Sequence, residues 1–280
     1  MNSTSRKKRS SFFRATVLSD KRPLDGRHAL VAGGSRGIGR ETSLRLARDG
    51  ADVAILARDR TRAEKVAEEV RALGRRSLTV CADLTEFDSV DSAVTAATGA
   101  EFPPDILVVT GAGGSQPKIG SFATLHPSTF PSYFEGQLFT RLHALSAVLP
   151  GMTDRGYGKV VFVTTDAGRV ATPGQAMHGA AASALMFSVR AIAKEVARQG
   201  IRVNAVSITV TRGSASWEDH QAGELAGPRL TEIFRRIEAQ AAFGLNEVHH
   251  VADVIAFFAS KASDQISGAT ISVNGGTSFP

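Results

Sequence analysis

Cysteine is nearly absent from this sequence, and aromatic side chains are few. Cys81 is the only cysteine among 280 residues, so no disulfide can form within the chain and we expect a reducing compartment. Because Cys81 lies beside the apolar Leu78 and Val80, we expect a buried, unreactive thiol. We also find no apolar run of the length that crosses a bilayer, and we therefore expect no association with a membrane.

Acidic residues are scarce at the start of the chain. Residues 1–23 carry seven basic side chains and one acid, which accounts for the whole net charge of +6. The rest of the chain is neutral, so the folded body gives no reason to expect nucleic-acid binding. We interpret residues 1–23, rich in Ser, Arg and Lys, as a disordered extension of a cytoplasmic protein. An organelle presequence also fits this composition, and a surface-binding arm is a third interpretation.

Strand and helix patterns alternate from residue 28 onward. Short apolar runs predict strands at 29–32, 52–57, 77–81, 106–109, 159–164, 201–207 and 269–273. Helical spacing places five apolar residues on one face after the second strand: Ala63, Val66, Ala67, Val70 and Leu73. Further helices are predicted from 38, at 131–152 with Ser128 as a cap, and at 174–199, 229–241 and 250–260. Strands separated by helices indicate an α/β domain in which a parallel sheet is covered on both faces.

A glycine-rich turn follows the first predicted strand and precedes the first helix. Its spacing is G-x-x-x-G-x-G, formed by Gly33, Gly37 and Gly39. We expect Gly33 to permit the turn, Gly37 to let a pyrophosphate approach the backbone, and Gly39 to let helix and strand pack closely. The N–H groups of the turn and the helix dipole both attract an anion. The arrangement therefore predicts a phosphate-binding site at this turn.

With these motifs the sequence resembles the short-chain dehydrogenase/reductase family over residues 24–277. The resemblance is carried by residues 32–39, 83–84, 111–113, 158–168, 201–206 and 268–276. It implies a single-domain α/β fold over 24–280, with a Rossmann-like, doubly wound, seven-stranded parallel sheet and helices on both faces. It also implies a nicotinamide dinucleotide at the carboxyl ends of the strands, a lid segment at 209–228, and a homodimer or homotetramer.

The adenosine end of the cofactor site matches the family well. Asp83 falls on the position that reads the adenine ring, and Arg58 ends the second strand where an acid would accept the ribose hydroxyls of NAD. Arg58 and Arg36 offer charge-assisted donors to a 2′-phosphate, so the site looks built for NADP(H), the alternative being that both arginines are merely solvated. The resemblance assigns cofactor contacts to Gly33, Ser35, Arg36, Gly37, Ile38, Gly39, Arg58, Asp83, Leu84, Gly111, Ala112 and Gly113.

The chemical end departs from the family pattern. Alignment on the neighbouring strands puts His178 where relatives have a catalytic Tyr, and Ala182 where they have its Lys partner. Thr165 keeps the hydroxyl of the usual Ser, and Gln137 takes the place of the usual Asn. We expect His178 to act as an acid because imidazole titrates near neutral pH, with Asp166 orienting or charging it. The smaller side chains predict a roomier pocket.

Three interpretations fit this mixture of kept and lost residues, and the last of them is the loss of cofactor binding altogether. The first is an NADP(H)-binding enzyme that acts on a small molecule. It is either a ketone or enone reductase with His178 as the acid, or a non-redox cyclase, isomerase or lyase that uses the same pocket. The second is a non-catalytic NADP(H)-binding pseudoenzyme, acting as a sensor or partner subunit. The flat helix face at 179–182 either admits a bulky ligand or packs against a neighbouring subunit.

Other conspicuous residues have structural explanations. His249 and His250 begin a predicted helix and, being adjacent, do not share a helix face, so we do not expect a metal there. His126 and His143 are also interpreted as structural. Residues 217–220, Trp-Glu-Asp-His, lie in the predicted lid, and we expect either that some of them touch substrate or that the loop is merely solvated.

Overall fold

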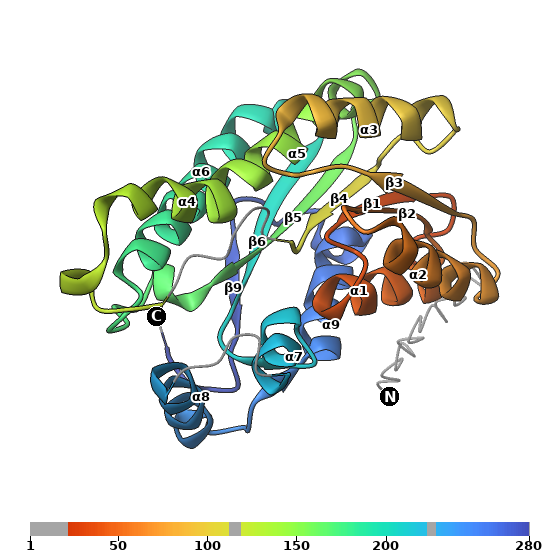
Figure 1. The fold of residues 1–280 in the computed structure, drawn as a ribbon. Helices are drawn as coiled ribbons and strands as arrows, with labels where there is room; N and C mark the ends of the chain where they lie inside the picture. Colours follow the sequence, from red (N-terminus) through yellow and green to blue (C-terminus); the bar gives the residue numbers. More distant parts are fainter. Residues whose placement is uncertain (1–21, 112–118, 223–227, 280) are drawn as a thin grey trace, which may run out of the picture.

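The computed structural model describes residues 22–111, 119–222 and 228–279, with the backbone alone for 228–230 (Figure 1). The expectations for residues 1–21 and for Ala112 and Gly113 lie outside these ranges. The strands are β1 (His28–Ala32), β2 (Asp52–Ala57), β3 (Ser77–Cys81), β4 (Ile106–Val109), β5 (Gly158–Thr165), β6 (Ile201–Ile208), β7 (Thr211–Arg212), β8 (Asn246–Glu247) and β9 (Thr270–Val273). The α-helices are α1 (Gly37–Arg48), α2 (Arg60–Ala72), α3 (Phe87–Gly99), α4 (Phe130–Phe134), α5 (Thr140–Asp154), α6 (Ala176–Val196), α7 (Ala215–Gln221), α8 (Pro228–Gln240) and α9 (Val248–Ala259).

Seven strands form one parallel sheet in the order β3-β2-β1-β4-β5-β6-β9, as the resemblance implied. In β1, Leu30 lies opposite Ala54 of β2 and Leu107 of β4. Apart from His28 at the start of β1 and Asp52 at the start of β2, these inner strands are apolar, because both of their faces are covered and neither meets water. A two-stranded parallel pair, β7 with β8, lies outside this sheet and was not predicted from the sequence.

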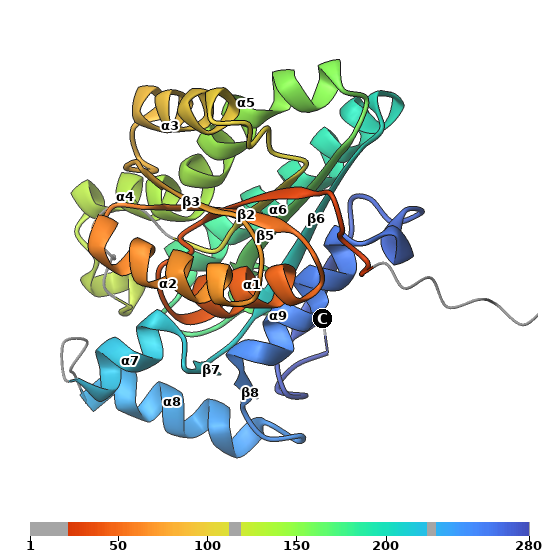
Figure 2. The same ribbon diagram turned by 90° about the vertical axis from the view of Figure 1, so that its right-hand side faces the viewer.

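Helices cover both faces of the sheet, which gives the predicted three-layer, doubly wound architecture (Figures 1 and 2). One hydrophobic core lies between the sheet and helices α3, α5 and α6, and the other lies between the sheet and helices α1, α2 and α9. Alternate residues of one strand serve the two cores. In β5, Val160 and Phe162 belong to the first core, and Val161 and Val163 belong to the second.

The long helix expected at 131–152 is present over 130–154, with a π-helical segment inside it that was not predicted. The short helix α4 passes into a π-helical turn, η3 (Glu135–Phe139), before α5 begins. Ser128 is not the cap of this helix, because it lies within a 3₁₀ turn, η2 (Pro127–Thr129). The backbone N–H of Ser128 donates a hydrogen bond to the ring of His126. A π turn inserts one residue into the helical period and shifts which side chains face the sheet, a change that a regular spacing of apolar residues does not reveal.

Cys81 is exposed, which corrects the expectation of a buried thiol. It is the last residue of β3, and β3 lies at one edge of the sheet. Successive strand residues point to opposite faces, so the burial of Val80 turns Cys81 outward.

The expectation that no apolar segment has the length to cross a bilayer also needs correction. The helical stretch Ala176–Gln199, which contains α6, is long and apolar enough to cross a bilayer by length and composition alone. Leu185 and Val189 of this helix are fully buried in the hydrophobic core beneath the sheet. Packing within the fold therefore explains the buried part of its apolar surface.

Candidate cofactor and active site

The carboxyl ends of the parallel strands lie along one edge of the sheet, and the direction of the strand order reverses between β1 and β4. Loops that leave neighbouring strands at such a point diverge, and parallel α/β sheets bind ligands in the crevice between them. The glycine turn follows β1, Thr165 ends β5, and His178 lies on the helix that follows β5. The predicted cofactor and catalytic residues therefore lie along the same edge.

The turn after β1 requires glycine at two positions. Gly33 has a φ of +84°, and a Cβ there would lie 2.5 Å from the backbone N of Gly111. A Cβ on Gly39 would lie 2.0 Å from the carbonyl O of Gly33. Gly33 therefore makes the tight turn and Gly39 lets α1 approach it closely, which are the backbone roles that the sequence predicted.

Gly37 faces the lid. A Cβ on this residue would lie 2.7 Å from the backbone N of Ala215 and 3.2 Å from the Cα of Ser214. These two residues form the beginning of α7, so the bare backbone of Gly37 admits the lid helix in addition to any role toward pyrophosphate. Of the other turn residues assigned to the cofactor, Ile38 is buried in the hydrophobic core and Ser35 is half-buried.

Two arginines, Arg36 and Arg58, lie at the adenosine end of the crevice. Arg36 pairs with Asp219 of α7, with N–O distances of 2.5 and 2.9 Å. Arg58 follows β2; its side chain is 59% exposed, and its guanidinium lies 4.0 Å from the carboxylate of Asp83. Asp59, the next residue, caps α2 by accepting a hydrogen bond from a backbone N–H. The end of β2 thus presents an exposed cation, while the adjacent acid is committed to the helix.

Asp83 is held in a single orientation after β3. Its Oδ1 accepts hydrogen bonds from the backbone N–H and the hydroxyl of Thr85, and the backbone contact is the main reason that the pKa of Asp83 is lowered. An ionised carboxylate only accepts hydrogen bonds, which suits the amino group of an adenine. Leu84 is buried, and its Cδ1 lies 3.6 Å from where a Cβ on Gly111 would be, so both residues line the same side of the turn.

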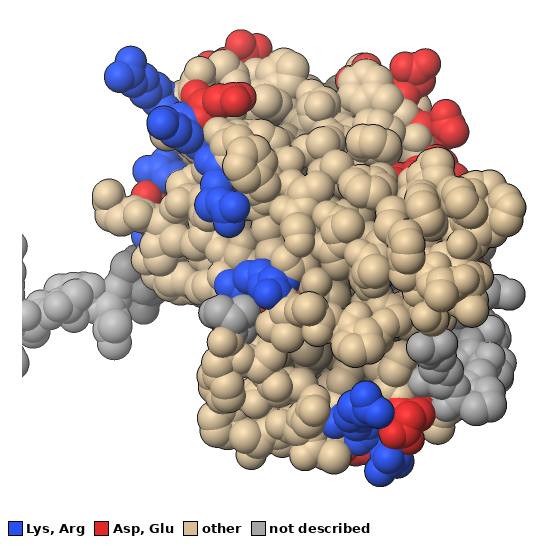
Figure 3. All heavy atoms as spheres, turned by 90° about the vertical axis from the view of Figure 1, so that its left-hand side faces the viewer, with Lys and Arg blue, Asp and Glu red and all other residues tan. Residues whose placement is uncertain are grey.

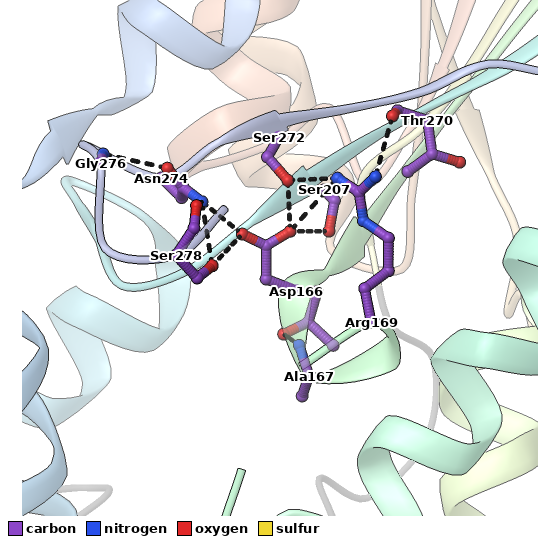
Figure 4. A network of polar contacts seen from close by, with 10 residues as sticks. Asp166, Ala167, Arg169, Ser207, Thr270, Ser272, Asn274, Gly276 and Ser278 are labelled. Atoms are coloured by element: carbon purple, nitrogen blue, oxygen red, sulfur yellow. Dashed lines mark hydrogen bonds and ion pairs between the residues drawn. The ribbon is translucent and has the colours of Figure 1, made fainter. Parts of the chain in front are cut away.

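Asp166 is the centre of a buried polar network (Figure 4). Its oxygens accept hydrogen bonds from side chains of β6, β9 and the segment that follows β9: Ser207 (2.6 Å), Ser272 (2.6 Å), Asn274 (2.7 Å) and Ser278 (3.2 Å). Arg169 lies 3.8 Å from the same carboxylate. The expectation that Asp166 orients or charges His178 is wrong, because these partners occupy both oxygens. The network instead ties the end of β5 to the C-terminal segment.

Hydroxyl groups gather where β5 and β6 end. The Oγ1 of Thr165 accepts a hydrogen bond from the N–H of Ala167 at 3.3 Å, which leaves the hydroxyl hydrogen for donation to a ligand. Thr164 and Thr209 carry buried hydroxyls that have no hydrogen-bond partner in the part of the chain that the structure describes. Buried polar atoms are normally paired, so their presence at this edge fits the binding of a polar ligand.

His178 lies on the first turn of α6, which packs against the 3₁₀ turn η4 (Asp166–Gly168) and against η3. Its Nδ1 is buried and makes no hydrogen bond with any described residue. Burial, and secondly the positive charge of Arg141, lower the pKa of His178 to about 4. The expectation that this ring titrates near neutral pH is therefore wrong, because removal from water penalises the imidazolium. At neutral pH the ring is uncharged and retains one N–H donor.

A buried cation lies near this histidine, and the sequence analysis missed it. Arg141 of α5 is 3% exposed, and its guanidinium donates to the carbonyl O of Val163, at 3.1 and 3.3 Å, and to that of Gly136. Burial lowers the pKa of Arg141 to about 10, which leaves the group charged at neutral pH. Gln137 lies next to Gly136 in the π turn and is buried as well. Apolar residues three, four and seven positions after Arg141 were the available signal that it faces inward.

Of the small residues at 179–182, Gly179, Ala181 and Ala182 are buried within the chain itself, whereas Ala180 is exposed. A Cβ on Gly179 would lie 2.4 Å from the carbonyl O of Ala167. A Cβ on Gly168 would lie 2.9 Å from the Cβ of Ala182. Ala182 is fully buried. The η4 turn therefore covers the face formed by Gly179 and Ala182. It occupies the space beside Ala182, where the sequence predicted a roomier pocket.

The lid predicted at 209–228 contains regular structure, including β7 and α7. Trp217 of α7 stacks nearly parallel on Phe234 of α8, with ring centroids 5.9 Å apart. His220 meets the same ring edge-on at 4.5 Å. These two residues of the predicted lid thus join α7 to α8.

The other histidines have structural partners. The Nδ1 of His143 lies 3.0 Å from the carbonyl O of Leu84, and His126 caps a 3₁₀ turn. His250 and Glu247 form a capping box at the start of α9. These contacts confirm the structural interpretation of His126 and His143.

Taken together, the residues along this edge fit a dinucleotide. Backbone that a Cβ would block forms the turn at Gly33 and Gly39. Asp83 provides an oriented acceptor and Arg58 an exposed cation at one end. Toward the other end lie His178, Thr164 and Thr209, each with a buried polar atom that has no hydrogen-bond partner among the described residues. The fold and site define a dinucleotide-binding α/β protein of the Rossmann type.

Comparisons with known proteins narrow this class. The short chain dehydrogenase family matches residues 27–224, and the chain belongs to this family of oxidoreductases, whose members bind nicotinamide cofactors. It is 32% identical to an uncharacterized oxidoreductase of Mycobacterium tuberculosis, over 94% of this chain and 97% of that protein. It is 30% identical to a cyclohexanol dehydrogenase of Rhodococcus sp., over 94% of this chain and all of that protein.

Solved structures agree with the assignment. An NADPH-bound short-chain oxidoreductase from Pseudomonas aeruginosa PAO1, which contains an atypical catalytic center, matches with a TM-score of 0.80 and 26% identity. The match covers 90% of this chain and 97% of that one. The fold and family of this protein are thus those of a short-chain dehydrogenase.

Proposed function

We propose that this protein binds NADP(H) in preference to NAD(H) and reduces a small ketone or enone. The observation that carries the cofactor preference is the placement of Arg36 and Arg58 at the adenosine end of the crevice. An acid facing the ribose would repel a 2′-phosphate, but Asp59 at the end of β2 is engaged as a helix cap. The NADPH in the related Pseudomonas aeruginosa structure supports the same preference.

The chemical end suggests how the substrate would be held. When bound, the nicotinamide supplies the hydride. The Thr165 hydroxyl and the neutral His178 ring each donate a hydrogen bond to the substrate oxygen. Arg141 contributes a positive potential that favours negative charge on that oxygen. Because His178 is uncharged, the site stabilises an alkoxide and leaves its protonation to solvent, in place of the proton relay expected from an acidic imidazolium.

A non-redox reaction is the second candidate. The Nδ1 of the neutral His178 ring, which makes no hydrogen bond with any described residue, is available to accept a hydrogen bond that positions a substrate for a cyclase, isomerase or lyase reaction. No contact in the described residues favours the pseudoenzyme alternative, in which NADP(H) binds without turnover.

Cofactor titration tests the first part of the proposal. We expect NADPH to bind at least about tenfold more tightly than NADH, and Arg58→Glu to reverse this preference. Lys65→Glu is the matched control, because Lys65 is exposed on the neighbouring helix α2 and the substitution changes the charge equally. Equal, weak binding of both cofactors by the wild-type protein would refute the preference.

Turnover tests the second part. NADPH absorbance is followed across a panel of ketones and enones, and product formation without loss of NADPH would favour the non-redox candidate. We expect His178→Ala to slow turnover by about 10²-fold. Tyr133 lies buried on α4, which packs against α6, so Tyr133→Phe checks whether a tyrosine from another helix supplies the usual phenol. Loss of turnover in Tyr133→Phe, with His178→Ala unaffected, would overturn the role of His178.

We also propose a homodimer or homotetramer. Phe139, which precedes α5, is 46% exposed, and Phe187 of α6 is 64% exposed. Figure 3 looks onto the side of the molecule where α4 and α6 lie and shows a broad area with few charged side chains. An area with few charged side chains, together with exposed phenylalanines, fits a subunit interface. Light scattering should show an oligomer that Phe187→Glu dissociates, and a monomeric wild-type protein would refute this.

A further inference from the structure

We propose that Asp219 of the lid helix is a built-in competitor for the 2′-phosphate of NADP(H), so that binding of the phosphorylated cofactor releases α7 from the glycine turn. This inference rests on the proposed NADP(H) preference. It assigns a specificity and gating role to a residue outside the expected cofactor set.

Helix α7 is fastened to the glycine turn at two points. Near its C-terminal end, both carboxylate oxygens of Asp219 pair with the two terminal nitrogens of Arg36, at 2.5 and 2.9 Å. At its N-terminal end, the backbone of Ser214 and Ala215 packs against the bare Cα of Gly37. The two contacts involve different residues and different interactions, so they independently place α7 against the start of α1 (Figure 1).

The Arg36 guanidinium explains the competition. A carboxylate and a phosphate both offer a pair of oxygens at the spacing of its two terminal nitrogens. Asp219 already occupies both of these nitrogens. A 2′-phosphate that takes the same two donors must displace the carboxylate, and the negative charges of the two groups repel each other at this range.

The surrounding charges favour exchange of one anion for another. The hydrogen bond from Arg36 is the main reason that the pKa of Asp219 is lowered, and the charge of Arg62 adds to it. The side chains of Arg36 and Asp219 remain 38% and 21% exposed, so the pair is accessible to solvent. An accessible ion pair of this kind contributes modestly to stability, and a dianionic phosphate is able to replace it.

Trp217 makes the movement measurable. It is the only tryptophan in the chain and lies on α7, two residues before Asp219. Its ring stacks on Phe234 and lies 6.0 Å from the guanidinium of Arg212. Displacement of α7 is therefore expected to change the intrinsic tryptophan emission without any label.

The test compares wild type with Asp219→Asn and uses NADPH, NADH, adenosine 2′,5′-bisphosphate and AMP as probes. We expect Asp219→Asn to bind NADPH about three- to tenfold more tightly and to leave NADH affinity unchanged. Glu69→Gln is the matched control, because it removes a carboxylate that also pairs twice with an arginine of α1, Arg40, without touching α7. Adenosine 2′,5′-bisphosphate, but not AMP, should shift the Trp217 emission of the wild type. The emission of nucleotide-free Asp219→Asn should already be shifted.

The outcomes separate this inference from the proposed function. If Asp219→Asn binds NADPH as tightly as the wild type or more weakly, the competition is overturned. Weaker binding is the result expected if the carboxylate only orients Arg36 for the cofactor. Equal emission of the two nucleotide-free proteins would also overturn it, and this readout needs no cofactor. Failure of the wild type to prefer NADPH over NADH, together with an unshifted preference in Arg58→Glu, would instead overturn the proposed cofactor.

Discussion

Acid should destabilise this protein partly through His178. The ring has an ordinary pKa of 6.5, whereas burial and the charge of Arg141 lower the pKa to about 4 in the folded protein. Between these two values the unfolded chain binds a proton that the folded protein excludes. The free energy of unfolding therefore falls as the pH is lowered through this window, and the difference in pKa corresponds to about 3 kcal/mol once the pH reaches the lower value.

Comparison with His178→Gln isolates this contribution. Urea unfolding of both proteins is measured between about pH 7 and about pH 4, and the carboxylates that titrate in this range are common to the two. We expect the wild type to lose about 3 kcal/mol relative to the variant over this interval. In parallel, NMR follows the Cε1 resonance of His178, with the other histidines of the chain, six in number, as internal references.

A His178 resonance that titrates near its ordinary value would refute the reasoning. So would a stability difference between the two proteins that stays constant across the pH range. Arg141→Met tests the cause, because removal of the guanidinium should raise the pKa of His178 while the ring stays buried.

Three further predictions concern the free energy of unfolding in urea. Gly39→Ala should cost about 1–3 kcal/mol because the new Cβ overlaps a backbone carbonyl, whereas Gly99→Ala, in open surroundings, should change little; equal losses would contradict this. Asp264→Asn should cost about 3 kcal/mol, because it leaves the buried ammonium of Lys159 without the carboxylate 2.7 Å away. Lys159→Met should cost much less, because the carboxylate of Asp264 that it leaves is accessible to water. The reverse order of these losses would show that the ammonium reaches water. Asp166→Asn should cost about 2–3 kcal/mol, because an amide replaces one acceptor oxygen of the network with a donor, and unchanged stability would speak against the network.

Local patterns sufficed for the regular parts of the fold. The strands β2, β3 and β4 have the bounds that the sequence predicted. For the inner strands β2 and β4 the reason is that a strand covered on both faces of a parallel sheet is largely apolar. The roles of Gly33 and Gly39 followed from spacing, since a tight turn and a close approach of helix to strand tolerate no side chain. The π-helical turn η3 was not predicted, because the spacing of apolar residues indicates a helix but does not reveal a single inserted residue.

Composition and spacing along the chain thus determined by themselves that this is a parallel α/β protein with a glycine turn suited to a phosphate, and the family resemblance added the dinucleotide. Only the tertiary structure decided the charge state of His178, which depends on burial and on a guanidinium from another helix. It also decided the partners of Asp166 and Asp219: Ser278 is 112 residues from the first, and Arg36 is 183 residues from the second. Interactions between residues so far apart leave no periodic trace in one sequence, because their geometry exists only after the sheet and its helices have packed.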